Sequence, residues 1–148
     1  MARGPLWTCP KCGRTFANIH QTHTCAPLGS VQAHFIGKEP QVRATFDRIL
    51  EIIRALGPVT VLPEKTRIAL HVRMSFAAFT PRIHWLDGHL VLARPATHPT
   101  FRKIERYSPR NVLHTLRLTH PSDIDPALSA LLTEAYRVGQ QHHLPTPG

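Results

Sequence analysis

All three cysteines of this chain, Cys9, Cys12 and Cys25, lie close to its N-terminus. An odd number of cysteines leaves one thiol unpaired after any disulfide forms, whereas a metal site can complete its ligand set with a histidine. His23 and Cys25 lie two positions apart, so both side chains project to the same side of an extended segment. We therefore expect Cys9, Cys12, His23 and Cys25 to bind one zinc ion (Zn2+).

The zinc assignment has two alternatives. His20 could replace His23 as the fourth ligand, although His23 is preferred. A redox role for Cys9 and Cys12 would require a thioredoxin-like βαβ context, which the N-terminal sequence lacks. Four protein ligands leave no open coordination position, so the ion should be structural and should stabilise a segment that is too small to fold by burial alone.

The length of 148 residues allows one compact domain with a small appendage. We expect a zinc finger and linker over residues 1–30, an α+β domain over 31–141 and a flexible tail over 142–148. Pro27 and Gly29 punctuate the linker. No apolar run approaches the roughly 18 residues that cross a bilayer, and no secretory signal is evident, so we expect a cytoplasmic location and no membrane partner.

Two segments have apolar residues at helical spacing. The first extends over residues 40–56 and is closed by Gly57 and Pro58. The second begins near Pro126, with Ser122 or Asp125 as its N-cap. Both patterns predict amphipathic helices.

The sequence between these helices is typical of strands. Apolar residues alternate from Ile68 to Phe76, which predicts one half-buried strand with Arg67, His71 and Arg73 on its exposed face. Helix, strands and helix in this order predict an α+β fold, in which two helices cover one face of an antiparallel β-sheet that is preceded by a small zinc finger or knuckle. The other face of the sheet would then be free.

Two hairpins are expected in this region. Asp87-Gly88 has the composition of a two-residue turn between strands at 83–86 and 89–93. Pro109 suits the second position of a turn at 108–111. The strands on either side of this second turn are expected at 101–107 and 112–118.

Positive charge is concentrated in the middle of the chain. The net charge is +9, and residues 65–117 contain ten basic residues against only Asp87 and Glu105. Like charges on neighbouring strands repel, so a polyanion is a natural counter-charge, and we expect a non-enzymatic nucleic-acid-binding protein, with DNA preferred over RNA. The predicted nucleic-acid-binding residues are Lys65, Arg67, Arg73, Arg82, Arg102, Lys103, Arg106, Arg110 and Arg117.

Other functions are alternatives. A small metal-dependent nuclease would need clustered carboxylates, and this region offers only Glu64 in addition to its two acids. His114 is the best single catalytic candidate, but it lies on the apolar side of its strand, which favours a buried structural role; no catalytic residue is assigned. An adaptor could bind a protein or a small anionic ligand through the same basic face. Trp85 and Phe79 could be core residues or a stacking platform.

The finger has the pattern Cys-Pro-x-Cys-x-x-x-Phe-x-x-x-x-Gln-x-His-x-Cys. With further matches around Phe35, Lys65 and His114, the chain resembles a bacterial family of domains of unknown function in which a very short zinc finger precedes an uncharacterised α+β domain. Similar domains occur beside restriction-type nuclease domains, so the resemblance implies DNA-related work without implying an activity.

Overall fold

The computed structural model describes residues 6–10, 15–16 and 29–141 of the chain. Of the predicted zinc ligands only Cys9 falls within these ranges, and it is buried. The other residues considered for the zinc site and the predicted tail lie outside the described residues: Cys12, His20, His23, Cys25 and 142–148.

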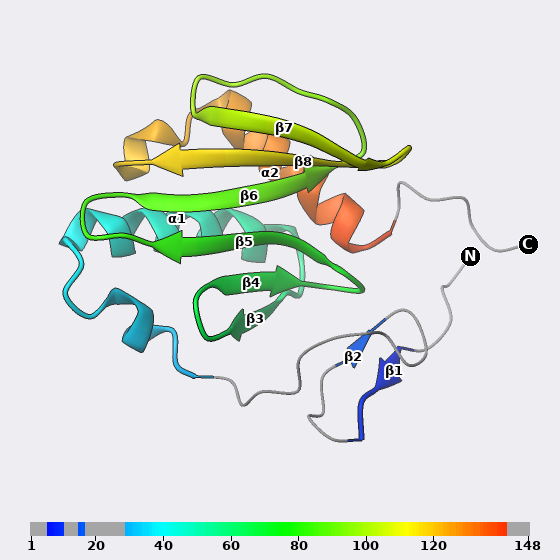
Figure 1. Ribbon diagram of the computed structural model, residues 1–148, viewed down its shortest axis with the longest axis horizontal. Helices are drawn as coiled ribbons and strands as arrows, with labels where there is room; N and C mark the ends of the chain where they lie inside the picture. The colour runs from blue at the N-terminus through cyan, green and yellow to red at the C-terminus, as the bar shows by residue number, and fades with distance from the viewer. Residues whose placement is uncertain (1–5, 11–14, 17–28, 142–148) are drawn as a thin grey trace, which may run out of the picture.

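A six-stranded antiparallel sheet forms the centre of the fold, and two helices pack behind it (Figure 1). This arrangement confirms the predicted α+β class. The strand order is β3-β4-β5-β6-β8-β7. The elements are β1 (Trp7–Thr8), β2 (Thr15–Phe16), the 3-10 helix η1 (Gln32–Phe35), α1 (Pro40–Leu56), β3 (Thr60–Pro63), β4 (Ile68–His71), β5 (Ser75–Pro81), β6 (Leu86–Leu92), β7 (Phe101–Ser108), β8 (Asn111–Leu118), the 3-10 helix η2 (Pro121–Asp123) and α2 (Pro126–Gly139).

Both predicted helices are present, and local chemistry explains their ends. Pro40 lies at the start of α1, where its missing N–H is no loss. Gly57 follows the helix with a φ of +155°, and a Cβ there would lie 2.5 Å from the Tyr136 hydroxyl oxygen. Asp125, and not Ser122, is the N-cap of α2, since its carboxylate accepts the backbone N–H of Leu128 at 2.8 Å.

The predicted continuous strand from residue 68 to residue 76 is wrong. The chain turns between β4 and β5, which pair with each other as antiparallel neighbours. The turn is fixed from outside, because the backbone N–H groups of Arg73 and Met74 both donate to the carbonyl oxygen of Gly139, at 2.8 and 3.2 Å. The apolar alternation in the sequence therefore spans a chain reversal, which the hydrogen bonds to the end of α2 hold in place.

His71 was expected on the exposed face and is instead buried, with only 5% of its surface accessible. Its Nδ1 lies 3.1 Å from the Ser75 hydroxyl oxygen across the turn. Burial lowers the pKa of His71, and a hydrogen bond with the backbone of Thr15 in β2 partly offsets this. Contacts from β2 and β5, which are not apparent from the β4 sequence, enclose this side chain.

The predicted turn at Asp87-Gly88 is also wrong, because both residues lie within β6. The chain reverses earlier, where the N–H of Arg82 donates to the carbonyl oxygen of Trp85 at 2.8 Å. Gly88 is required for packing, since a Cβ at this position would lie 2.4 Å from Cδ1 of Phe79. The glycine therefore reflects a close approach of two strands. The second predicted hairpin is confirmed by the pairing of β7 with β8.

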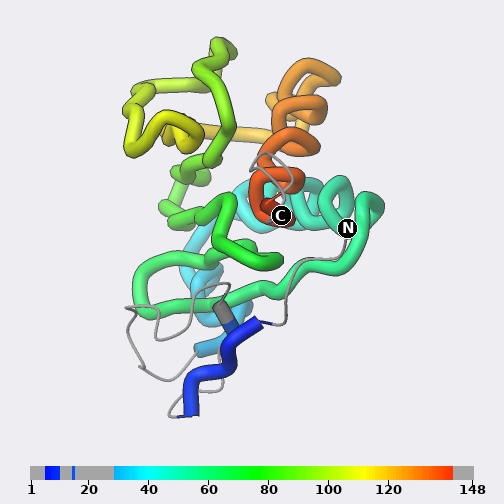
Figure 2. Tube along the Cα trace, turned by 90° about the vertical axis from the view of Figure 1, so that its right-hand side faces the viewer, coloured from blue at the N-terminus to red at the C-terminus, as the bar shows by residue number. Residues whose placement is uncertain are grey.

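The hydrophobic core lies between the sheet and the helices, and α1 and α2 lie to one side of the sheet in Figure 2. Phe46 from α1 and Phe79 from β5 meet there with ring centroids 6.1 Å apart, so Phe79 is a core residue. The opposite side of the sheet, hereafter the open face, has no helix of the described residues over it (Figure 1). Within the described part of the chain, no helix has the length and apolar character that a bilayer crossing requires.

Candidate anion-binding site on the open sheet face

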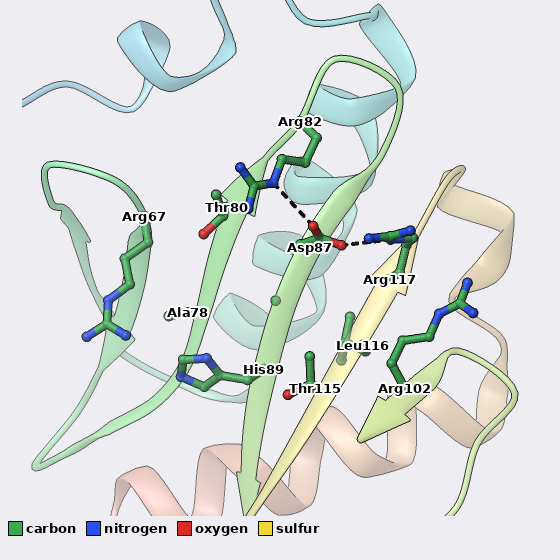
Figure 3. Close-up of a pocket in the computed structure, with 11 residues that line it drawn as sticks. Arg67, Ala78, Thr80, Arg82, Asp87, His89, Arg102, Thr115, Leu116 and Arg117 are labelled. Carbon is green, nitrogen blue, oxygen red and sulfur yellow. Dashed lines mark hydrogen bonds and ion pairs between the residues drawn. The ribbon is translucent and has the colours of Figure 1, made fainter. Parts of the chain in front are cut away.

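The open face carries a cavity of about 380 Å3 across β5, β6 and β8 (Figure 3). Strand register builds its floor in two rows, because Thr80 pairs with Asp87 and Asp87 with Arg117, while Ala78 pairs with His89 and His89 with Thr115. The cavity is called the arginine pocket here. Its lining residues are Arg67, Ala78, Thr80, Arg82, Asp87, Gly88, His89, Arg102, Thr115, Leu116 and Arg117.

Four arginines reach the pocket from separate parts of the chain. Arg67 immediately precedes β4, Arg82 follows β5, Arg102 lies in β7 and Arg117 lies in β8. Figure 3 shows Arg82 and Arg117 directed at Asp87, with Arg67 and Arg102 at opposite sides of the pocket. Guanidinium groups bind phosphate and carboxylate oxygens through paired N–H donors, so this cluster has the chemistry of an anion site.

Asp87 holds two of the four guanidinium groups. Its Oδ1 accepts from Nε of Arg117 at 2.9 Å, and its Oδ2 accepts from Nε of Arg82 at 3.2 Å. Burial alone would raise the pKa of the Asp87 carboxyl, but the hydrogen bonds from the arginines outweigh it and hold the pKa below its ordinary value. Both bonds use Nε, and among the described residues the terminal nitrogens of Arg82 and Arg117 make no hydrogen bond.

The other two arginines are constrained less. Arg67 donates from Nε to a carboxylate oxygen of Glu64 at 3.0 Å. Arg102 is exposed and makes no ion pair within the ranges that the structure describes. Its charge is therefore available to a ligand without breaking a contact.

His89 lies on the pocket floor as a neutral imidazole. Burial, with a smaller contribution from the charge of Arg67, lowers its pKa to about 4. At neutral pH the ring can donate one hydrogen bond and accept another. No hydrogen bond from this ring to any described residue is present, so both nitrogens can serve a ligand.

Trp85 fixes the position of Arg117 from the β5–β6 turn. The guanidinium carbon of Arg117 lies 4.3 Å from the centroid of the indole ring, which is the geometry of a cation–π contact. Together with Asp87, this contact restricts Arg117 on two sides. The pocket is consequently preorganised around one of its main donors.

Four of the nine predicted nucleic-acid-binding residues thus line one pocket, and five do not. Arg73 is bound by Gln141 at the end of α2, Nε to Oε1 at 3.0 Å. Lys103 forms an ion pair with Glu105, and Nη1 of Arg106 donates to the carbonyl oxygen of Pro109 at 3.0 Å. The five residues outside the pocket are Lys65, Arg73, Lys103, Arg106 and Arg110.

Sequence reasoning missed the polar residues on the pocket floor. Asp87 and His89 are two positions apart on β6, which is the spacing of side chains on one sheet face. This spacing is visible in the sequence, but the assignment of Asp87-Gly88 to a turn excluded a strand through Asp87 and His89. Thr80 and Thr115 carry no signal of their own, because only the strand register brings them beside these residues.

His114 is a structural residue of the core, as its place on the apolar side of β8 indicated. Its Nε2 accepts the backbone N–H of Ala96 at 2.9 Å, so Nδ1 carries the proton and donates to the carbonyl oxygen of Val112 at 3.0 Å. Burial lowers the pKa of His114 and keeps the ring neutral. Among the described residues, no group of three or more His, Cys, Asp or Glu side chains could hold a metal ion.

Residues 31–139 match the model of a family described as Domain of unknown function (DUF5655). The matched range begins after the predicted linker and includes every residue that lines the arginine pocket. The match agrees with the resemblance to an uncharacterised α+β domain. Neither the curated proteins nor the solved structures contain a match to this chain.

Proposed function

The chain belongs to the DUF5655 family, and from the geometry of its open face we propose that it binds nucleic acid, with DNA preferred, through the arginine pocket. The observation that carries this proposal is that Arg67, Arg82, Arg102 and Arg117 line one pocket, in which Asp87 holds two of them. Phosphate oxygens complement such a cluster, because the terminal guanidinium nitrogens can donate to them in pairs. Neutral His89 and the two threonine hydroxyls of the floor supply further hydrogen bonds without adding charge.

The test compares two charge reversals at exposed arginines. Arg102→Glu places a negative charge at the pocket, whereas Arg137→Glu changes the net charge equally on α2, away from the open face. Fluorescence anisotropy with labelled DNA at low salt should show at least a tenfold loss of affinity for Arg102→Glu and a small loss for Arg137→Glu. Equal losses would mean that binding follows net charge only, and no binding by the wild type would remove the proposal.

Nuclease activity is separated from binding by incubating the protein with supercoiled plasmid and Mg2+. The proposed role, binding without catalysis, predicts a mobility shift without nicking. Nicking that is lost in Arg102→Glu would replace this role with that of a nuclease.

A second candidate is a small phosphorylated ligand, and the volume of the pocket favours it. Its volume of about 380 Å3 suits a compact anion, whereas a purely electrostatic surface needs no cavity. Competition distinguishes the two candidates. Millimolar inorganic phosphate should displace a small ligand, whereas heparin and unlabelled DNA should displace labelled DNA at far lower concentrations.

We also propose that Cys9, Cys12, His23 and Cys25 bind one structural zinc ion. The donor chemistry supports the proposal, since three thiolates and one imidazole form a closed tetrahedral set. Cys9 is buried and directly follows β1, which pairs with β2. Native mass spectrometry of the reduced protein should detect one zinc ion per chain, and Cys12→Ser should lose it while His20→Ala retains it. Loss of zinc in His20→Ala with retention in His23→Ala would identify His20 as the ligand.

A further inference from the structure

A second cavity adjoins the arginine pocket at the β5–β6 turn. It has a volume of about 400 Å3 and is called the apolar pocket here. Its lining residues are Lys38, Pro81, Arg82, Ile83, His84 and Trp85. Arg82 lines both cavities, so a ligand that extends from one side of Arg82 to the other would contact both.

The apolar pocket exposes hydrophobic surface that the core does not use. Ile83 is 56% exposed although it is a large aliphatic residue. Trp85, which is partly exposed, lines the same pocket beside the buried Pro81, while Lys38 and Arg82 contribute the positive charge. Apolar walls with basic residues suit the flat, weakly polar faces of a nucleobase whose phosphates lie at the edge.

The turn that carries these residues is held by hydrogen bonds and an ion pair within the protein. The N–H of Arg82 closes the turn on the carbonyl oxygen of Trp85, and the N–H of Glu39 donates to the carbonyl oxygen of Ile83 at 2.9 Å. The carboxylate of Glu39 also pairs with His84. A preformed surface costs less entropy on binding, so an exposed isoleucine held in this way is suited to a contact.

On the premise that the proposed function holds, we propose that the preferred ligand is a single strand, with a phosphate in the arginine pocket and an unpaired base in the apolar pocket. A duplex keeps its bases stacked and paired, so it can offer phosphates to Arg82 and Arg117 but no base to Ile83. The apolar pocket would therefore contribute to affinity only for unpaired nucleotides.

The experiment compares three labelled DNA ligands of equal length at low salt: a single strand, the same strand with abasic nucleotides and a duplex. The single strand should bind roughly tenfold more tightly than the abasic strand, since covering the exposed apolar surface of Ile83 with a base contributes affinity of that order. It should also bind more tightly than the duplex, which offers more phosphates.

Matched variants locate the base-binding surface. Ile83→Ala should remove most of the advantage of the single strand while leaving the affinity for the abasic strand unchanged. Ile104→Ala is the control, because Ile104 is a 42% exposed isoleucine on β7 that lines neither pocket. Ile104→Ala should still bind the single strand more tightly than the abasic strand and the duplex.

Each other outcome identifies what fails. Equal affinity for the single and abasic strands, or preference for the duplex, would overturn the base site while the nucleic-acid proposal stands. An advantage that survives Ile83→Ala would also overturn the assignment to the apolar pocket. Absence of binding to all three ligands would overturn both proposals.

Discussion

Asp87 shows how one side chain sets the character of the arginine pocket. Its carboxylate accepts hydrogen bonds from Nε of both Arg82 and Arg117, which orients the two guanidinium groups and leaves their terminal nitrogens for a ligand. Asp87, together with the Glu64 that pairs with Arg67, places two negative charges against four positive charges, so the pocket remains cationic. The carboxylate thus positions the arginines without neutralising the site.

His89 leads to a prediction of acid sensitivity. Because its pKa in the folded protein, about 4, lies below the ordinary value of 6.5, the unfolded chain takes up the proton first as the pH falls. His89 therefore leaves the free energy of unfolding unchanged above about pH 6.5. Between about pH 6.5 and pH 4 it lowers this free energy by up to about 3 kcal/mol. Urea denaturation at several pH values measures this loss.

The control for this prediction is His89→Gln, which keeps a neutral polar side chain at all these pH values. Its free energy of unfolding should fall less steeply over the same interval. His71 and His114 also have lowered pKa values, and their contribution is the same in the wild type and in His89→Gln. Identical slopes for the wild type and His89→Gln would show that His89 does not carry the effect.

At the scale of elements, Gly88 is the residue that allows β5 and β6 to approach each other. Gly88→Ala would place a methyl group 2.4 Å from the Phe79 ring and 2.8 Å from the Ala78 carbonyl oxygen. Overpacking of this kind should lower the free energy of unfolding by about 1–3 kcal/mol. Gly29→Ala is the matched control, since its Cβ would lie 3.8 Å from the nearest atom. Equal stability of the two variants in urea denaturation would contradict this role of Gly88.

The N-terminus of α2 gives a second test at this scale. Asp125→Ala should lower the thermal unfolding temperature, because the backbone N–H of Leu128 loses its acceptor and Nε2 of His98 loses its partner at 2.9 Å. Ser122→Ala should leave the temperature nearly unchanged, since Ser122 lies in η2 and does not cap α2. A larger decrease for Ser122→Ala would indicate that Ser122, and not Asp125, caps the helix.

At the scale of the whole molecule, the net charge of +9 and the pocket together predict a salt dependence. If the four pocket arginines each meet a phosphate, the affinity for DNA should fall roughly 50- to 150-fold between about 50 and 200 mM salt. Anisotropy titrations across this range give the slope. Arg102→Glu should reduce the slope, while Arg137→Glu should leave it close to that of the wild type. A slope near zero would exclude phosphate contacts as the main source of affinity.

The sequence by itself determined the features that rest on local periodicity and local chemistry. Both helices and the Pro109 turn were predictable, because helical apolar spacing, a proline at its preferred position and a capping acid act within a few residues. The excess of arginine in the middle of the chain was also visible without a structure. These features do not depend on which strands become neighbours.

Only the tertiary structure decided which side chains meet. The turn after His71 depends on the carbonyl of Gly139, and the need for Gly88 depends on the Phe79 ring of the adjacent strand. Four of the nine predicted arginines and lysines share a pocket because the order β4-β5-β6-β8-β7 brings together the strands that carry or adjoin Arg67, Arg82, Arg117 and Arg102. Pairing between distant segments is a property of the folded sheet, and no local pattern in the chain encodes its register.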